Sequence, residues 1–84
     1  MIKHLVISGR VQGVGFRYWL QSLATKKNIF GWVKNTISGN VEALIVGNEK
    51  EVEDLIKLCK KGPLASKVDH VKVSKYKKNY LEKS

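Results

Sequence analysis

The chain has 84 residues, of which 43% are hydrophobic and 27% charged, and its formal net charge at pH 7 is +9. This length suits one domain with a thin core, so residues 1–84 are expected to form a single globular domain rather than a disordered chain. The sequence contains no apolar run of membrane-spanning length and no signal-peptide pattern, and its one cysteine excludes an internal disulfide. A cytoplasmic protein is therefore expected.

The positive charge comes mainly from lysine. Fourteen of the sixteen cations are lysines, and nine of the sixteen lie from Lys57 onward, dispersed over the last third of the chain. Dispersed lysines favour a solvated surface, with an anionic partner such as nucleic acid as the alternative. The two arginines differ, because Arg10 and Arg17 bracket a stretch that is dense in glycine.

The first half of the chain predicts a strand, a glycine loop, a helix and a hairpin. The run Ile2–Ser8 is rich in β-branched residues and has apolar residues at both odd and even positions, so both faces of the strand are partly apolar, which is typical of a central strand. Apolar residues at helical spacing after the loop predict an amphipathic helix that ends near Asn28. Residues 29–36 and 41–46 then predict two paired strands, joined by the turn sequence ISGN at 37–40.

The second half predicts a helix and one more strand. Asn48 is a suitable N-cap, and Glu51 three residues later completes a capping-box pattern. Acids crowd the first turns and lysines the last, as the helix dipole prefers, and Gly62–Pro63 ends the helix. Val68–Lys75 predicts a fourth strand, while the polar tail after it is left between a short fifth strand and a frayed end.

The predicted order of elements is βαββαβ. This order is the split βαβ arrangement of an α+β, ferredoxin-like sandwich, with a four-stranded antiparallel sheet and both helices on one face. The fold hosts many functions, so function has to be argued from particular residues.

Conventional catalytic groups are poorly represented. His4 and His70 lie in the middle of predicted strands without a motif around them, and Glu42 alternates with apolar residues. Cys59 belongs to the apolar stripe of the second helix, which indicates an inert buried thiol. Metal-ligating residues are too few and too scattered for a zinc or calcium site, so neither a metal nor a cofactor is expected.

The glycine stretch GRVQGVGFR, residues 9–17, offers a different chemistry. A glycine-dense turn can aim successive backbone N–H groups at an anion, and the helix N-terminus that follows adds its positive dipole end. Neither the Walker nor the dinucleotide-binding pattern fits this stretch. Arg17 in the first helical turn opposes the dipole by roughly 0.3–1 kcal/mol, a conflict that a shared anion would remove. The alternative is a long side chain that bends into solvent.

Together, GRVQGVGFR and GWVKNTISGNVE resemble the acylphosphatases, small enzymes that hydrolyse carboxyl-phosphate mixed anhydrides. Gly62–Pro63 and the valine-rich strand after it also fit, and the resemblance covers nearly the whole chain. The resemblance implies that residues 1–84 form one acylphosphatase-like domain. The C-terminal NYLEKS departs from the aromatic-containing last strand that family members often have, which bears on that strand and not on the site.

The resemblance also implies the site. It implies that Asn35 orients the attacking water and that Arg17 holds the substrate phosphate together with the backbone amides of the loop. The loop residues are Gln12, Gly13, Val14, Gly15, Phe16 and Arg17. Asparagine is a poor strand former whose amide both accepts and donates hydrogen bonds, which agrees with this role, although a turn-flanking asparagine is the alternative. Because the leaving carboxylate is a weak base, hydrolysis needs no protein acid and no metal.

The expected partners follow from this activity. They are a small acylphosphate substrate and inorganic phosphate as product and inhibitor, with no membrane or nucleic acid and a monomeric chain. An RNA-recognition module is one rival, but the first and third predicted strands lack the stacking aromatics that such modules use. A phosphate sensor without turnover is another rival, and the presence of both Arg17 and Asn35 argues against it. Arg10 is expected to help at most through its charge or a surface contact, and the physiological acylphosphate stays open.

Overall fold

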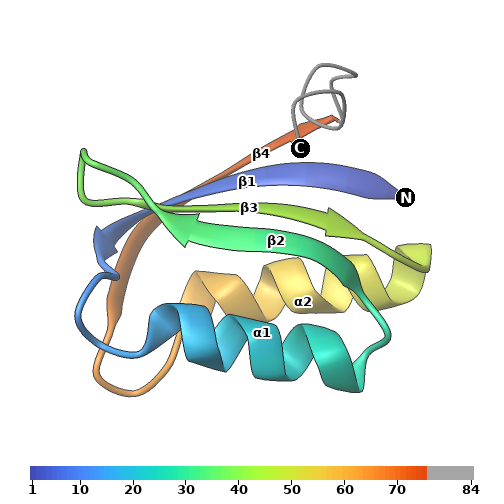
Figure 1. Ribbon diagram of the computed structural model, residues 1–84, viewed down its shortest axis with the longest axis horizontal. Coiled ribbons are helices and arrows are strands. Elements are labelled where there is room, and N and C mark those ends of the chain that lie inside the picture. Colours follow the sequence, from blue (N-terminus) through green and yellow to red (C-terminus); the bar gives the residue numbers. More distant parts are fainter. Residues whose placement is uncertain (76–84) are drawn as a thin grey trace.

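The computed structural model of the protein describes residues 1–75 (Figure 1). Residues 76–84 lie outside the described residues. This is the tail for which a short fifth strand and a frayed end were the alternatives. No helix within residues 1–75 is long and apolar enough to cross a membrane. The elements are β1 (Ile2–Arg10), α1 (Phe16–Lys26), β2 (Phe30–Asn35), β3 (Val41–Val46), α2 (Glu49–Lys61) and β4 (Lys67–Lys75).

The predicted βαββαβ sandwich is confirmed. The four strands form one antiparallel sheet in the order β2-β3-β1-β4, and both helices cover the same face of it (Figure 1). The first strand of the chain is central, as its apolar residues at both parities predicted, because β3 and β4 pair with it on either side. The edges of the sheet are therefore β2 and β4.

The core lies between the sheet and the two helices. Alternate residues of β1 and β3 face the helices, and they meet the apolar stripes of α1 and α2. Burial of each such side chain contributes roughly 1.5–3 kcal/mol. The core residues with 2% exposure or less are Leu5, Ile7, Val11, Phe16, Leu20, Val41, Ala43, Val52, Leu55 and Cys59.

The opposite face of the sheet carries a polar cluster around His4. His4 is 5% exposed and its Nε2 lies 2.6 Å from Oε2 of Glu42, whose Oε1 lies 3.5 Å from Nζ of Lys34. The ring of Trp32 packs edge-on against His4 at 6.1 Å between centroids. The interpretation of His4 as structural agrees with these contacts, and His70 is exposed on β4. The sheet thus separates this imidazole and carboxylate from the helical side.

Local residue types set the start of α2 and the end of α1. Oδ1 of Asn48 accepts a hydrogen bond from the N–H of Lys50 at 2.9 Å, so the predicted N-cap of α2 is confirmed, and the carboxylate of Glu51 lies 3.6 Å from Nζ of Lys27. Helix α1 ends at Lys26, two residues before the predicted end near Asn28. The chain leaves α1 through Asn28 at φ 57, a left-handed residue of the kind that closes many helices.

Cys59 generates a prediction about pH and thiol reactivity. Burial raises the pKa of its thiol from 9.0 to about 12. Since the pKa is higher in the folded state, the stabilisation is complete below the unfolded pKa and is lost as the pH rises through the folded one, by at most about 1.4 kcal/mol per pH unit. Urea denaturation between these pH values should show a shallower loss of unfolding free energy in Cys59→Ala. Iodoacetamide at pH 8 should label wild-type Cys59 only when urea is present, and equal labelling without urea would contradict the assignment.

Candidate active site

The loop between β1 and α1 has a backbone that glycine makes accessible. Gly13 and Gly15 have φ angles of 73° and 78°, in the left-handed region. A Cβ at either position would meet nothing within 4 Å, so these positions require glycine for conformation rather than for space. Left-handed residues interleaved with ordinary ones turn successive N–H groups toward a common side, which is the geometry of an anion-binding nest.

The N-terminus of α1 lacks the features that normally complete a helix start. Its N-cap is Gly15, no side chain of the described part caps it, and its first turn contains no acidic residue. Helix α2 has an asparagine cap and two first-turn glutamates at the same positions. The first amides of a helix have no partner within it, and they carry the positive end of the dipole. In α1 no side-chain cap of residues 1–75 and no first-turn acid offsets this positive end.

A cavity of about 220 Å³ opens at this helix start. Figure 1 shows that the β1–α1 loop lies at the end of the molecule where β2 also finishes. The cavity therefore brings Arg17 of α1 together with Asn35, the last residue of β2. We call it the loop cavity, and its lining residues are Val11, Gly13, Gly15, Phe16, Arg17, Tyr18 and Asn35.

Arg17 and Asn35 are both exposed and available to a ligand in this cavity. Within residues 1–75, no carboxylate lies within ion-pair distance of Arg17. The same part of the chain contains no group of three or more His, Cys, Asp or Glu residues that could hold a metal ion. The cavity thus offers a guanidinium and amide groups that can donate to a phosphate, together with the phenol of Tyr18, and its lining residues include no carboxylate, imidazole or thiol.

Two predicted loop residues turn away from the cavity. Val14 is half-buried and packs against the core. The side chain of Gln12 reaches the β2–β3 turn, where its Nε2 donates to the carbonyls of Thr36 at 2.8 Å and Asn40 at 2.7 Å. Sequence reasoning treated Gln12 only as a source of a backbone amide and missed this contact. A single sequence does not show which distant residue a side chain contacts. The only signal here is that Gln12 is a polar residue between apolar neighbours.

The fold and the cavity together define a class of protein: an antiparallel α+β sandwich with a glycine-rich loop and an open cavity at the start of its first helix. The family model for acylphosphatase matches residues 3–84. The chain belongs to the acylphosphatase family, and it is accordingly a hydrolase that acts on acid anhydrides.

Individual relatives give the same result. The chain is 49% identical over 61 residues to an acylphosphatase of Acidiphilium cryptum, which covers 73% of this chain and 67% of the relative. It is 46% identical over 71 residues to an acylphosphatase of Nitrobacter hamburgensis, with coverages of 84% and 72%. The crystal structure of acylphosphatase from Bacillus subtilis has a TM-score of 0.86 at 40% identity, covering 92% of this chain and 87% of that one. Full-length HypF in a phosphate- and nucleotide-bound form also matches, with a TM-score of 0.80, 35% identity, and coverages of 90% and 10%.

The Gln12 contact generates a prediction about stability and turnover. Gln12→Ala removes two hydrogen bonds that hold the loop to the hairpin carrying Asn35, which should cost about 1–3 kcal/mol of unfolding free energy. Gln12→Glu should cost as much, because a carboxylate cannot donate to carbonyls. In both variants kcat for benzoyl phosphate should fall by a larger factor than KM rises.

Ser22→Ala is the control, since Ser22 is exposed on α1 away from the hairpin. Chemical denaturation and steady-state kinetics measure the two effects. If Gln12→Glu matched wild type in both, the contact would have no positioning role.

Proposed function

We propose that residues 1–84 act as a single acylphosphatase domain that binds the phosphoryl group of an acylphosphate in the loop cavity and hydrolyses it without a metal ion. The observation that carries this proposal is the uncapped start of α1, which opens into one cavity with Arg17 and Asn35. In this proposal, Arg17 and Asn35 are the catalytic residues.

The phosphoryl oxygens are held by the loop amides and by Arg17. The amides of residues 12–17 supply donors whose geometry is present before the substrate arrives, so little reorganisation is needed when charge develops. The planar guanidinium of Arg17 can donate two parallel hydrogen bonds to the phosphate. Both groups act on the equatorial oxygens, where the charge of a phosphoryl-transfer transition state is spread.

Asn35 orients the attacking water on the side of the phosphorus opposite the leaving acyl oxygen. Its side-chain oxygen accepts a hydrogen bond from the water, and its amide can donate to a phosphate oxygen. The water oxygen forms a bond to phosphorus as the bond from phosphorus to the acyl oxygen breaks. The proton of the water passes to a phosphate oxygen, so the products are inorganic phosphate and a carboxylate.

The chemistry of the leaving group removes the need for a protein acid. A carboxylate departs as a weak base, so positioning and electrostatic stabilisation can supply the acceleration. The residues that line the loop cavity in the described part of the chain include no carboxylate, imidazole or thiol, which supports this mechanism.

The finer features of the protein belong to the same proposal. It works as a cytoplasmic monomer, and phosphate, its product, inhibits it. A single buried cysteine suits a reducing compartment. The two central strands, β1 and β3, carry no Phe, Tyr or Trp, and the ring of His4 on β1 is buried, which supports a small-molecule substrate over nucleic acid.

The catalytic assignment predicts the rates of three variants. In the presence of EDTA, wild-type protein should release phosphate from benzoyl phosphate at its full rate. Arg17→Ala should lower kcat/KM by at least about 10²–10³, the cost of losing one transition-state donor, and Asn35→Ala should act mainly on kcat. Arg10→Ala is the matched control, because Arg10 flanks the same loop but does not line the cavity. Full activity of Arg17→Ala would overturn the site, and loss of activity with EDTA would overturn metal independence.

Phosphate binding at the loop predicts a change in stability. A ligand that binds the folded state alone at 100 times its dissociation constant adds about 2.7 kcal/mol. Inorganic phosphate should therefore raise the melting temperature of wild type and Arg10→Ala, and much less that of Arg17→Ala. Chloride at equal ionic strength is the control for salt effects. An equal rise in all three proteins would place phosphate elsewhere.

A further inference from the structure

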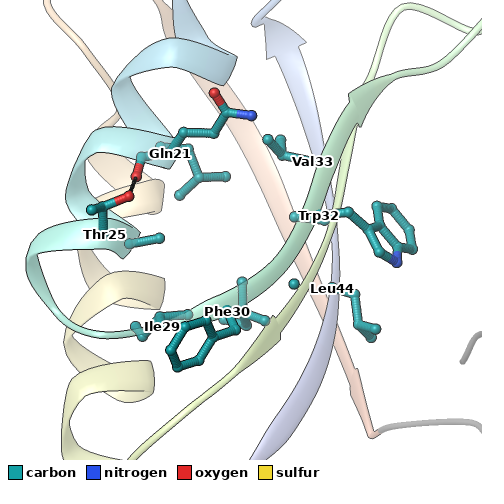
Figure 2. A pocket seen from close by; sticks show the side chains of 12 residues that line it. Gln21, Thr25, Ile29, Phe30, Trp32, Val33 and Leu44 are labelled. Carbon is teal, nitrogen blue, oxygen red and sulfur yellow. Dashed lines mark hydrogen bonds between the residues drawn. The ribbon is translucent and has the colours of Figure 1, made fainter.

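A second cavity lies between α1 and β2, with a volume of about 350 Å³ (Figure 2). We call it the α1–β2 groove. Helix α1 contributes Leu20, Gln21, Ala24 and Thr25 to its lining, and β2 contributes Gly31 and Val33. Among the described residues, none of those that line it is charged, in a chain with a net charge of +9. Figure 2 shows Val33 directed toward the helix side, while Trp32 and Leu44 point to the opposite side of the strands.

The backbone of β2 creates this space. Successive residues of a strand point to opposite faces of the sheet, and Trp32 points away from the helices (Figure 2). The position of Gly31, which pairs with Ile45, therefore faces the helices, and glycine places no side chain there. Its φ is 134°, and a Cβ there would lie 1.8 Å from the carbonyl oxygen of Leu44, so a larger residue cannot fill the gap without moving the sheet. The small side chain of Ala24 leaves the facing part of α1 equally open.

The groove and the loop cavity lie one after the other along the same seam between α1 and β2. Gln21 follows Arg17 by one helical turn, and Val33 precedes Asn35 by two residues, so each pair lies on one face of its element. Because α1 and β2 run antiparallel, Arg17 and Asn35 form one end of the seam, and Thr25 and Gly31 form the other (Figure 1). The distance along α1 from Arg17 to Thr25 is about 12 Å at 1.5 Å per residue.

The chemistry changes from one end of the seam to the other. The loop cavity offers amides and a guanidinium, whereas the groove is lined mainly by aliphatic and aromatic residues and glycine, with Gln21 and Thr25 as its polar side chains. The hydroxyl of Thr25 donates to the carbonyl of Gln21 at 2.9 Å, so it is already satisfied within the helix. Figure 2 shows the amide of Gln21 directed across the mouth of the groove toward β2. An acylphosphate has the same two-part chemistry, a phosphate joined to an acyl chain.

We infer that the α1–β2 groove binds the acyl group of the substrate, and that the preferred substrates are acylphosphates with an apolar acyl chain of about six to eight carbons. This inference rests on the proposed function, because it takes the phosphate to lie in the loop cavity. A volume of 350 Å³ would hold about twelve waters at about 30 Å³ each, and a methylene is of similar size, so such a chain fits with room to spare. The volume is also within the range of small-molecule sites.

The test compares acetyl phosphate with octanoyl phosphate, each below its aggregation limit. Both release an aliphatic carboxylate, so a difference in rate reports binding of the chain rather than the reactivity of the anhydride. Each buried methylene is worth up to about fourfold in affinity, from 0.8 kcal/mol per group. The octanoyl to acetyl ratio of kcat/KM should therefore be at least about tenfold for the wild-type protein, even when the chain is only partly buried.

Variants locate the preference in the groove. Ala24→Leu fills the groove and should lower the octanoyl to acetyl ratio at least about tenfold, while acetyl phosphate hydrolysis stays within about twofold of wild type. Ser22→Leu adds the same side chain at an exposed position of α1 outside the groove and should keep the wild-type ratio. Gln21→Trp is the second variant in case Ala24→Leu fails to fold. It places a large ring at an exposed position on the mouth of the groove and should also lower the octanoyl to acetyl ratio.

The outcomes separate the inference from the proposed function. A wild-type ratio near one, or a ratio that Ala24→Leu and Gln21→Trp leave unchanged, overturns the inference about the groove while acetyl phosphate hydrolysis keeps the proposed function. Failure to hydrolyse either compound overturns both. A ratio that falls in the groove variants alone supports the groove as the acyl site.

Discussion

The constraint on which the site depends is the start of α1. The chain enters this helix through two left-handed glycines, Gly13 and Gly15, and no side chain of residues 1–75 caps the helix that follows. Its first turn and Arg17 border one cavity, and no carboxylate of residues 1–75 forms an ion pair with Arg17 there. This arrangement is electrostatically unfavourable by itself, and an anion bound there would stabilise it. Helix α2, with its asparagine cap and first-turn acids, shows that the same chain completes a helix start where no ligand is needed.

The rest of the fold positions this anion site and isolates it. The sandwich places the end of β2 beside the loop, so Asn35 faces the same cavity as Arg17, and Gln12 links the loop to the hairpin through two carbonyls. The sheet keeps the charged and polar cluster of His4 on the other face. The lysines account for most of the positive charge of the chain, but no lysine of residues 1–75 lines the cavity. In the proposed function, a few loop amides, Arg17 and Asn35 therefore carry the chemistry.

The sequence predicts most of the fold, because its patterns are local. The helical stripe of Val52, Leu55 and Cys59 and the two apolar parities of β1 are readable from spacing alone. The glycines and Arg17 could be singled out for the same reason, since each conflicts with a local preference. The contact of Gln12 with Thr36 and the groove beside Gly31 could not be predicted, because they depend on which segments the tertiary fold brings together. Asn35 lies between these cases: its local pattern also fits a turn, the family resemblance assigned it to the site, and its place at the end of β2 puts it in the same cavity as Arg17.

Titration of ¹⁵N-labelled protein with inorganic phosphate, followed by NMR, tests the central claim most directly. If the loop and α1 hold the anion, saturable shifts should concentrate on the amides of residues 12–18, on the side-chain N–H of Arg17 and on the side-chain amide of Asn35. The amides at the start of α2, where Asn48 already caps the helix, should move little. Shifts confined to the lysines of α2 and β4, or absent from the loop at saturating phosphate, would contradict the account.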